Sequence, residues 1–571
     1  MSEDRYYWRK HYPEGVPYNV DYPDVPLYEF LYRAAEKYPQ NTALIFMGKE
    51  ITYAELKDLV DRFATSLVQK GVKKGDRVAI MLPNSPQAVI AYYGALRVGA
   101  VVVQTNPLYV ERELEHQMKD SGCETIIFID LVTPRIMNVL DKTNLKNLIV
   151  TSVKDFLPFP LNLLYPLKAR MDGQAVSIPT DKGIIQFKDM LSASPNPPKV
   201  EIDPSKDVAL LQYTGGTTGI SKGAMLSHLN LVANAIQISS WIPEAKEAKE
   251  RMLGALPFFH VYGMTVAMNL AVYLCSTIIL IPRFDIEQIL KDINKYRPTL
   301  FPGAPTMYVA VISHPEVKNY DISSIVACIS GSAALPVEVQ KTFESLTGGR
   351  LVEGYGLTEA SPVTHCNPVF GRRINGSIGL PLPDTDSRIV DMDTGEAVPQ
   401  GEVGELSVKG PQVMLGYWNM PEETEQVLND GWLLTGDMGR MDEEGYTYIV
   451  DRKKDLVIAS GFNIYPREVE EVLYEHPKVM EAVVAGVPDR YRGETLKAYV
   501  VLKDGETATE EEIIAFSRER LARYKAPKIV EFRTELPKTM VGKVLRRVLV
   551  EEEKKKLADI IETAEEDDKE E

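Results

Sequence analysis

The sequence predicts an α/β fold made of several domain-sized parts, and three observations support this prediction. The chain has 571 residues, which is enough for roughly three to four domains that each bury a core. Segments typical of strands and of helices alternate in its first part, as in a parallel sheet with crossover helices. Residues 376–417 then change to short β segments with Gly/Pro turns, which predict a small antiparallel sheet or barrel.

The first elements follow from the spacing of apolar residues. Residues 27–38 place them at helical intervals, and Thr52 followed by Glu55 predicts the capped start of a second helix. The apolar run at 78–82 is typical of a strand, and a Pro-Asn-Ser turn then leads into a helix that extends to about Val98. Further strands are expected at 101–104, 126–129 and 147–151.

Residues 155–167 break this alternation, because three prolines lie among large apolar residues. Proline removes a backbone donor and clashes with the preceding turn, so we expect neither a regular helix nor a central strand here. Two interpretations stay open. The segment is a loop packed on the core, or a surface that meets membrane lipid or guides an apolar substrate inward.

Residues 252–282 contain no Asp, Glu, Lys or Arg and are long enough to span a bilayer. Pro257, His260 and Asn269 interrupt the segment, and a β-branched run at 277–281 ends it. We therefore expect a loop, a buried helix and a buried strand in place of a membrane span.

Composition and charge narrow the classes of function. The 44% of hydrophobic and 25% of charged residues are ordinary for a globular protein. Asp and Glu (81) outnumber Lys and Arg (64), and the formal net charge of −17 argues against nucleic acid as a general partner. The N-terminal residues are charged and aromatic, without the apolar core of a signal peptide. We expect a cytoplasmic protein.

The cysteines agree with that compartment. They are scattered along the chain without a short metal-ligand spacing, which suits a reducing environment and predicts no disulfide framework. They are Cys123, Cys275, Cys328 and Cys366.

The strongest chemical signal is Tyr-Thr-Gly-Gly-Thr-Thr-Gly-Ile-Ser-Lys-Gly at 213–223, which directly follows an apolar strand at 208–211. Glycines permit a tight turn in which successive N–H groups point at one anion, while the threonines add hydroxyl donors and Lys222 adds a positive charge. From its residues alone the segment is either a phosphate-binding loop or a simple turn. It is not the common nucleotide loop, because no Gly stands five residues ahead of a Gly-Lys pair.

This segment resembles, almost letter for letter, the phosphate loop of the adenylate-forming superfamily of acyl-CoA synthetases, luciferases and peptide-synthetase adenylation domains. The resemblance extends from about Leu27 to Arg547. It is closest to the bacterial long-chain fatty-acid CoA ligases through the segments LPFFHVYGMT, DGWLLTGD, DRKKD and ASGFNIYP.

The resemblance implies a large N-terminal domain of two α/β layered subdomains plus a small β-barrel-like subdomain, hinged to a small, mobile α+β C-terminal domain. The corresponding boundaries are 1–200, 201–375, 376–453 and 454–571. The second of these parts would hold the phosphate loop and the adenine site.

The resemblance also assigns the nucleotide site. Tyr355 can stack on a base, and Glu359 offers the hard carboxylate oxygen that Mg²⁺ prefers beside substrate phosphates. Asp437 can accept two hydrogen bonds from a ribose diol, with Arg452 as its positively charged neighbour. The phosphate-binding residues would be Thr214, Gly215, Gly216, Thr217, Thr218, Gly219 and Lys222. The adenine-binding residues would be Gly331, Ser332, Ala333, Glu353, Gly354, Tyr355, Gly356, Leu357 and Thr358.

Catalysis and the remaining substrates are assigned in the same way. Lys543 would meet the carboxylate and the α-phosphate, within a basic stretch at 523–547 that suits a polyanionic ligand. Lys454 is the implied hinge, inside a charged run at 451–455 that is typical of a solvated linker. The catalytic residues would be Lys543, Thr214, Lys222 and Glu359. The acyl pocket would hold His260, Tyr262, Gly263 and Gly303, without a role in proton transfer, and the CoA path Ser460, Gly461 and Phe462.

The implied function is that of an ATP-dependent ligase that uses ATP, Mg²⁺ and CoA. A long-chain fatty acid would be activated as acyl-AMP with release of pyrophosphate, and the acyl group would then pass to CoA. Positive groups bring the two anions together, so no side-chain nucleophile is needed. Rotation about Lys454 would separate the two half-reactions.

Two alternatives stay open. One is an adenylating ligase for an aryl or medium-chain acid, or one with a carrier protein as acceptor. The other is a non-enzymatic peripheral membrane protein that binds or moves fatty acid. Contact with the inner face of the cell membrane and a homodimer are further expectations.

Overall fold

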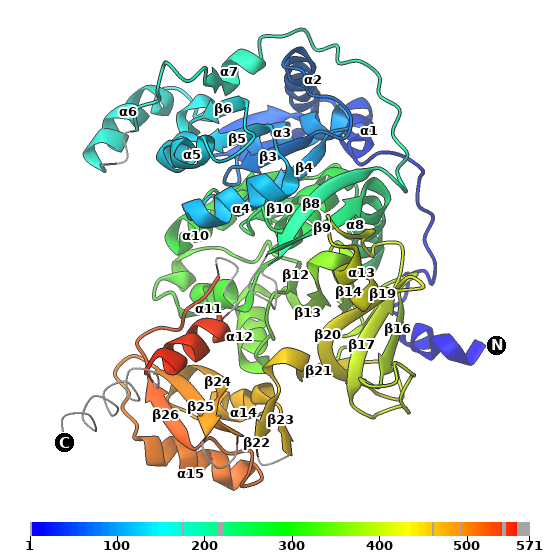
Figure 1. The fold of residues 1–571 in the computed structure, drawn as a ribbon, viewed down its shortest axis with the longest axis vertical. Coiled ribbons are helices and arrows are strands. Elements are labelled where there is room, and N and C mark those ends of the chain that lie inside the picture. Colours follow the sequence, from blue (N-terminus) through cyan, green and yellow to red (C-terminus); the bar gives the residue numbers. More distant parts are fainter. Residues whose placement is uncertain are drawn as a thin grey trace. The chain divides into compact units, whose positions relative to one another are not determined.

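The computed structural model describes residues 3–173, 176–214, 221–459, 462–489, 493–539 and 544–556 (Figure 1). The chain divides into two compact units. The first comprises Met1–Ser387, Val408–Leu433 and Glu444–Tyr446, and the second comprises Arg388–Ser407, Leu434–Glu443 and Thr447–Glu571. The mixed sheets and helices of both units confirm the predicted α/β class.

The largest sheet has eight strands in the order β18-β9-β8-β4-β3-β5-β6-β7. Its strands from β8 to β7 pair in parallel, as the alternation of strands and helices predicts, whereas β9 runs antiparallel to β8 and β18 antiparallel to β9. The strands are β3 (Arg77–Met81), β4 (Val101–Gln104), β5 (Thr125–Ile129), β6 (Asn147–Thr151), β7 (Ile185–Gln186), β8 (Val208–Thr214), β9 (Lys222–Ser227) and β18 (Gly416–Tyr417).

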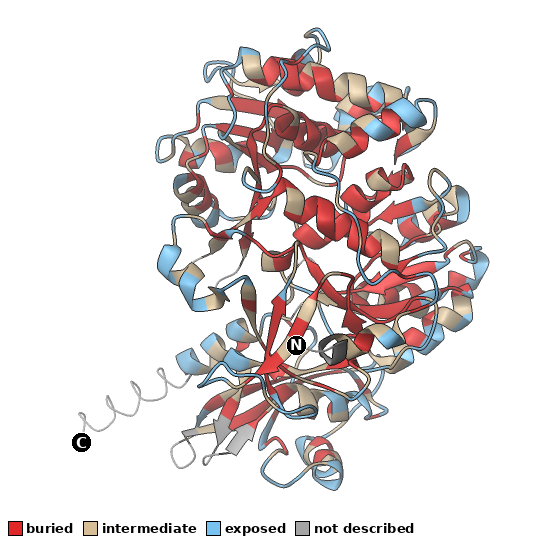
Figure 2. Cartoon of the chain, turned by 90° about the vertical axis from the view of Figure 1, so that its right-hand side faces the viewer, coloured by how far each residue is buried: buried red, intermediate tan, exposed pale blue. Residues whose placement is uncertain are grey.

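Helices follow the parallel strands in sequence. Every residue of α3 except its last, Arg97, is buried. Figure 2 shows the sheets of the first unit as mostly buried residues, with exposed residues gathered on outer helices and loops. The helices of this region are α2 (Tyr53–Gln69), α3 (Pro86–Arg97), α4 (Glu111–Ser121), α5 (Thr133–Leu140), α6 (Leu161–Met171) and α7 (Phe187–Met190).

Two four-stranded sheets complete the first unit, in the orders β10-β11-β1-β2 and β12-β13-β14-β15. Their strands are β1 (Thr42–Phe46), β2 (Lys49–Thr52), β10 (Arg251–Gly254), β11 (Thr277–Leu280), β12 (Ala327–Ser330), β13 (Arg350–Gly356), β14 (Val363–Cys366) and β15 (Leu380–Pro381). The accompanying helices are α1 (Glu29–Lys37), α8 (His228–Trp241), the π-helix Gly263–Asn269, α9 (Leu270–Tyr273), α10 (Ile286–Tyr296), α11 (Pro305–Ser313) and α12 (Val337–Thr347).

Two sheets contain strands from both sides of residue 200, the predicted boundary between the two α/β subdomains. Strand β1 comes before this residue and pairs with β11 far after it, while β8 and β9 come after it and join the sheet of β3 to β7. Hydrogen bonding therefore links segments on both sides of the predicted boundary between the two α/β subdomains. The division into four parts stays a prediction.

A small sheet in the order β16-β17-β20-β19, with β21 on β20, corresponds to the short β segments expected after residue 376. Strand β20 runs antiparallel to both β19 and β21. The elements are β16 (Asp386–Val390), β17 (Gly404–Lys409), α13 (Pro421–Val427), β19 (Leu428–Asn429), β20 (Trp432–Met441) and β21 (Thr447–Arg452).

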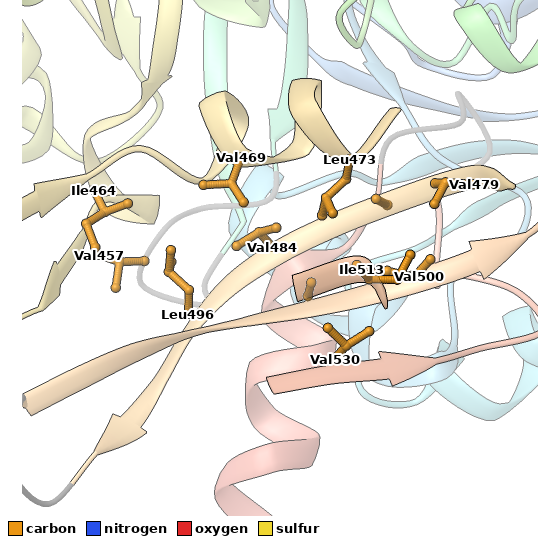
Figure 3. Close-up of a cluster of buried hydrophobic side chains, with 12 residues drawn as sticks. Val457, Ile464, Val469, Leu473, Val479, Val484, Leu496, Val500, Ile513 and Val530 are labelled. Carbon is orange, nitrogen blue, oxygen red and sulfur yellow. The ribbon is translucent and has the colours of Figure 1, made fainter. Parts of the chain in front are cut away.

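A five-stranded sheet with two helices lies within the second unit. Its strands follow the order β23-β22-β25-β24, with β26 parallel to β25. Figure 3 shows Val469 and Leu473 of α14 meeting Val484 of β24, which forms one buried apolar cluster. The elements are β22 (Val457–Ala459), β23 (Phe462–Ile464), α14 (Pro466–Tyr474), β24 (Val479–Asp489), β25 (Gly493–Leu502), α15 (Glu510–Arg520) and β26 (Ile529–Phe532).

Several local predictions are confirmed. The Thr52 hydroxyl accepts from the Glu55 N–H at 3.2 Å, and the Glu55 carboxylate accepts from the Thr52 N–H at 2.8 Å, which is the predicted capping box at α2. Residues 252–282 contain a loop, the buried π-helix with α9, and the buried strand β11. In the described part of the chain, every helix is too short or too polar to cross a membrane.

The prediction that residues 155–167 contain no regular helix is wrong for residues 161–167. Helix α6 begins at Leu161 and continues through Pro166 to Met171. The proline removes only one backbone hydrogen bond, and α6 has no buried residue, so water can hydrate the carbonyl that lost its donor. The penalty that excludes proline from a buried helix is therefore smaller here.

The interpretation of 451–455 as a solvated linker is wrong at its first residue. Asp451 lies in β21 with 4% of its surface exposed. Its carboxylate accepts from the backbone N–H groups of Arg452 at 2.7 Å and Arg467 at 2.8 Å, which compensates for the lost water. Burial raises the pKa of Asp451 to about 6. Lys454, by contrast, is exposed as predicted.

Candidate active site

The base of one hairpin brings two predicted phosphate-binding residues together. Thr214 ends β8, Lys222 begins β9, and the two are partners across the antiparallel pair. The Ser221 hydroxyl donates to the Thr214 carbonyl at 2.6 Å and closes the base of the turn. The predicted residues Gly215, Gly216, Thr217, Thr218 and Gly219 lie outside the described residues.

Tyr213 anchors this hairpin. It faces Gly223 across the two strands, and a Cβ atom at Gly223 would lie 3.1 Å from the tyrosine ring. The Tyr213 hydroxyl donates to the Asp120 carboxylate of α4 at 2.6 Å. Burial, assisted by Asp120, raises the pKa of Tyr213 far above its usual value, so the hydroxyl stays a donor. The glycine and the tyrosine thus fix the strand ends that carry Thr214 and Lys222.

Lys222 lies in a network with three other side chains. Its ammonium group pairs with the Glu423 carboxylate of α13 and lies 5.1 Å from the centroid of the Tyr417 ring. The Tyr417 hydroxyl donates to Oε1 of Glu359 at 2.8 Å. Burial, together with the Glu359 charge, raises the pKa of Tyr417 well above its usual value, so it remains protonated. The structure therefore makes the predicted phosphate-binding lysine and metal-binding carboxylate neighbours.

Glu359 fits a magnesium site that is completed by substrate. It lies in the short helix Thr358–Ala360, and its backbone carbonyl accepts from the Met414 N–H at 2.8 Å. The described residues contain no group of three or more His, Cys, Asp or Glu that could hold a metal by themselves. A single hard carboxylate is what Mg²⁺ uses when phosphates and water supply its other ligands. The donor set thus agrees with the predicted ion.

The predicted adenine segments lie at the ends of two paired strands. Ser330 of β12 pairs with Glu353 of β13, and Gly331 and Gly354 follow them. The Glu353 carboxylate accepts from the Leu335 N–H at 3.3 Å. The two predicted adenine segments thus start at or directly after one strand pair, and they comprise Gly331, Ser332 and Ala333 on one side and Glu353, Gly354, Tyr355, Gly356, Leu357 and Thr358 on the other.

Tyr262 joins the predicted acyl pocket to this region. Its hydroxyl donates to the Ile329 carbonyl at 2.6 Å, with the Gly303 carbonyl at 3.3 Å. A Cβ atom at Gly331 would lie 3.0 Å from the tyrosine ring, so the ring packs on this glycine. Burial raises the pKa of Tyr262 well above its usual value, which agrees with a wall residue that transfers no proton.

Two other predicted pocket residues surround Tyr262. Nδ1 of His260 accepts from the Tyr262 N–H at 3.3 Å. At Gly263 a Cβ atom would lie 2.3 Å from the Pro257 carbonyl, which leaves no space for a side chain. His260, Tyr262, Gly263 and Gly303 thus form one group, next to Gly331.

The predicted ribose residues pair in the second unit. Asp437 of β20 and Arg452 of β21 are partners across the two strands, with Arg452 Nε 3.5 Å from Asp437 Oδ1. The Lys454 side chain follows in the turn Lys453–Asp455, where partial desolvation and the Arg452 charge lower its pKa. Ser460, Gly461 and Lys543 lie outside the described residues, and Phe462 begins β23.

The basic stretch at 523–547 is largely paired with carboxylates of the same unit. The pairs are Lys525 with Glu468, Arg533 with Glu552, Lys538 with Glu481, Arg546 with Glu470 and Arg547 with Glu551. These ion pairs offset part of the positive charge of the stretch, and its suitability for a polyanionic ligand stays a prediction.

Two residues of the Lys222 network were not predicted. Tyr417 is the last residue of a two-residue strand, and Glu423 lies in the first turn of α13. A Pro followed by two Glu at 421–423 is an ordinary helix start, and a Gly-Tyr pair is an ordinary strand end. Their contacts with Lys222 and Glu359, which lie far away in the chain, appear only in the folded structure.

Comparison with protein families identifies the group to which this site belongs. The model of the AMP-binding enzyme matches residues 31–418, and that of the AMP-binding enzyme C-terminal domain matches residues 468–543. The chain belongs to the AMP-binding enzyme family. The matches include the hairpin at Thr214 and Lys222, the Glu359 segment and the position of Lys543.

Relatives within the AMP-binding enzyme family match nearly the whole chain. The long-chain-fatty-acid–CoA ligase of Bacillus subtilis is 54% identical and covers 96% of this chain and 98% of its own length. The ligase of the same name from Escherichia coli O6:H1 is 41% identical, covering 96% of this chain and 99% of its own length.

Solved structures of the AMP-binding enzyme type have the same fold. ATP-bound MatB from Rhodopseudomonas palustris is 32% identical with a TM-score of 0.79, covering 92% of this chain and 99% of that one. The fatty acyl CoA synthetase of Mycobacterium tuberculosis is 30% identical with a TM-score of 0.70, covering 92% and 98%.

Proposed function

We propose that the chain is an ATP-dependent ligase that converts a long-chain fatty acid into acyl-AMP with release of pyrophosphate and then transfers the acyl group to CoA. The long-chain-fatty-acid–CoA ligases among its relatives support this reaction. The structural observation that carries it is the pairing of Thr214 with Lys222 at one hairpin base. Tyr417 contacts both Lys222 and the Glu359 carboxylate and so links the hairpin to the predicted metal ligand.

The chemistry follows from charge. A carboxylate attacks the α-phosphate of ATP poorly because both are anions, so the protein has to hold them together and offset the charge of the transition state. Lys222 and the Thr214 hydroxyl bind phosphate oxygens at the hairpin base. Mg²⁺, when bound at Glu359, neutralises phosphate charge. We assign to Lys543 the contact with the carboxylate and the α-phosphate, and no side chain forms a covalent bond.

The other substrates are assigned to the segments already described. The group around Tyr262 forms a wall of the acyl pocket next to Gly331, and Tyr355 stacks on adenine. Asp437 binds the ribose hydroxyls, with Arg452 beside it. Ser460, Gly461 and Phe462 line the path of CoA, and rotation about Lys454 exchanges the adenylating and thioester-forming arrangements.

Helix α6 supports peripheral contact with a membrane. Its apolar side chains and the preceding Phe159 are exposed, with Leu163 at 68% and Leu167 at 62%. Lys168 and Arg170 lie in its last turn, although the chain as a whole carries a charge of −17. Apolar side chains beside basic ones suit the interface of an anionic bilayer. We propose that α6 contacts the inner face of the cell membrane.

We also propose that the chain forms a homodimer. Light scattering over a range of protein concentrations tests it.

The reaction is tested by pyrophosphate release from Mg·ATP with a series of fatty acids and with benzoate, in the presence and absence of CoA. We expect release to be greatest with long chains and thioester to form only when CoA is present. Greatest release with benzoate or a medium-chain acid would assign a different acid class. ATP binding without turnover of any acid would favour a protein that only binds or moves fatty acid.

A further inference from the structure

Tyr417 lies between two groups that the proposed function uses. Its hydroxyl donates to Glu359 Oε1 at 2.8 Å, and the centroid of its ring is 5.1 Å from the ammonium group of Lys222. One side chain therefore contacts both the carboxylate assigned to Mg²⁺ and the lysine assigned to phosphate. Only 8% of its surface is exposed.

The backbone around Tyr417 is held from both sides. The Leu415 N–H donates to the Met225 carbonyl at 2.9 Å and the Trp418 N–H donates to the Gly223 carbonyl at 2.8 Å, which fixes this segment to the strand that carries Lys222. The Met414 N–H donates to the Glu359 carbonyl at 2.8 Å, which fixes it to the Glu359 helix as well. The tyrosine thus has a defined place between the two elements.

Each half of the side chain restricts a different neighbour. A carboxylate rotates with little preference about its last torsion. A donor on Oε1 fixes that rotation, while Oε2 accepts no hydrogen bond from the described residues. The Lys222 side chain has four rotatable bonds, and the Tyr417 ring and the Glu423 carboxylate together confine its ammonium group.

We propose that Tyr417 is a positioning residue of the nucleotide site. Its hydroxyl orients Glu359 for Mg²⁺, and its ring, together with Glu423, holds Lys222 toward the phosphates. This inference rests on the proposed function, which assigns Mg²⁺ and phosphate to these two residues.

The decisive variant is Tyr417→Phe, which keeps the ring and removes only the hydroxyl. We expect the dissociation constant of Mg·ATP, measured by calorimetry on the full chain, to rise about tenfold, since a hydrogen bond to a charged group is lost. Binding of ATP in excess chelator should stay within about twofold of wild type, because the ring still holds Lys222. Tyr417→Leu removes the ring and should weaken binding in both conditions.

A matched control is Tyr53→Phe, which removes the hydroxyl of another buried tyrosine of the same unit, one that donates to the Ser276 carbonyl at 2.6 Å. It should lower the midpoint of thermal unfolding as Tyr417→Phe does and leave Mg·ATP binding unchanged. A merely structural role for Tyr417 predicts the same behaviour in both variants, and that result would overturn the inference.

Glu359→Gln separates this inference from the proposed function. If it weakens Mg·ATP binding and Tyr417→Phe does not, the inference is wrong and the function stands. If wild type binds no Mg·ATP, or Glu359→Gln binds it as wild type does, the metal assignment is wrong and the inference is wrong with it.

Discussion

Two glycines of the predicted adenine segment have no space for a side chain. A Cβ atom at Gly356 would lie 2.0 Å from the Pro362 carbonyl, and one at Gly354 would lie 2.7 Å from Cγ2 of Ile329. The resemblance assigns both glycines to the adenine site. The structure shows that their nearest neighbours are other parts of the same unit, so these glycines first allow β13 to pack against its surroundings.

His228 makes the stability of the first unit depend on pH. It begins α8, is 1% exposed, and its Nδ1 accepts from the Leu27 N–H at 3.2 Å. Burial lowers the pKa of His228 to about 4, below the value of about 6.5 in an unfolded chain. The folded chain thus binds this proton less readily, so the contribution to stability is complete above about pH 6.5 and is lost as the pH falls toward 4.

We expect the free energy of unfolding to fall by about 2 kcal/mol through this residue when the pH is lowered from 7 to 5. His228→Asn keeps an acceptor near the position of Nδ1 and cannot titrate, so its stability should change less over this interval. The midpoints of urea unfolding of both proteins, measured at several pH values, give the difference. If the unfolding midpoints of the two proteins changed with pH in the same way, the pKa of His228 would not differ between the folded and unfolded states.

At the scale of elements, α6 carries the proposed membrane contact. We expect Leu163→Glu with Leu167→Glu to weaken binding to phosphatidylglycerol vesicles at least about tenfold, because two leucines inserted into the bilayer contribute several kcal/mol to binding. Co-sedimentation with vesicles measures this effect. Turnover of a short, soluble acid should be unchanged, since no residue assigned to the site lies in α6.

The matched control is Leu108→Glu with Val110→Glu, which places two charges on another pair of exposed apolar residues, each 59% exposed. This control should bind vesicles as wild type does. Equal losses in both double variants would mean that added negative charge weakens binding wherever it lies, and the assignment to α6 would then be abandoned.

At the scale of the whole molecule, we expect Lys543 to be needed for adenylation and not for thioester formation. Lys543→Ala should reduce pyrophosphate release at least about a hundredfold, because a charge that offsets the transition state is removed. It should spare thioester formation from supplied acyl-AMP and CoA, since this step needs no new contact with the α-phosphate. Separate assays of pyrophosphate and thioester distinguish the two effects.

Lys538→Ala is the control for this prediction. It removes another lysine of the same segment, one that pairs with Glu481 inside the second unit. Pyrophosphate release should remain near the wild-type rate in this variant. Loss of both half-reactions in Lys543→Ala would contradict the separation of roles between the two arrangements about Lys454.

The sequence by itself determined the local structure of the first elements, and it predicts phosphate chemistry for residues 213–223. Apolar spacing predicted α1 and the strands from β3 to β6, and Thr52 with Glu55 predicted a cap, because these signals come from residues a few positions apart. Proline chemistry misled at α6, where exposure to water reduces the cost of a missing donor.

Only the tertiary structure decided which segments meet. The pairing of β1 with β11 and of β18 with β9 could not be read from local patterns, because the partners lie far apart in the chain. The same applies to Lys222 and Glu423, which are 201 residues apart, and to Tyr417 and Glu359, which are 58 apart. The pairing of β18 with β9, and the packing of α13 and of the Glu359 helix against this segment, bring these side chains together.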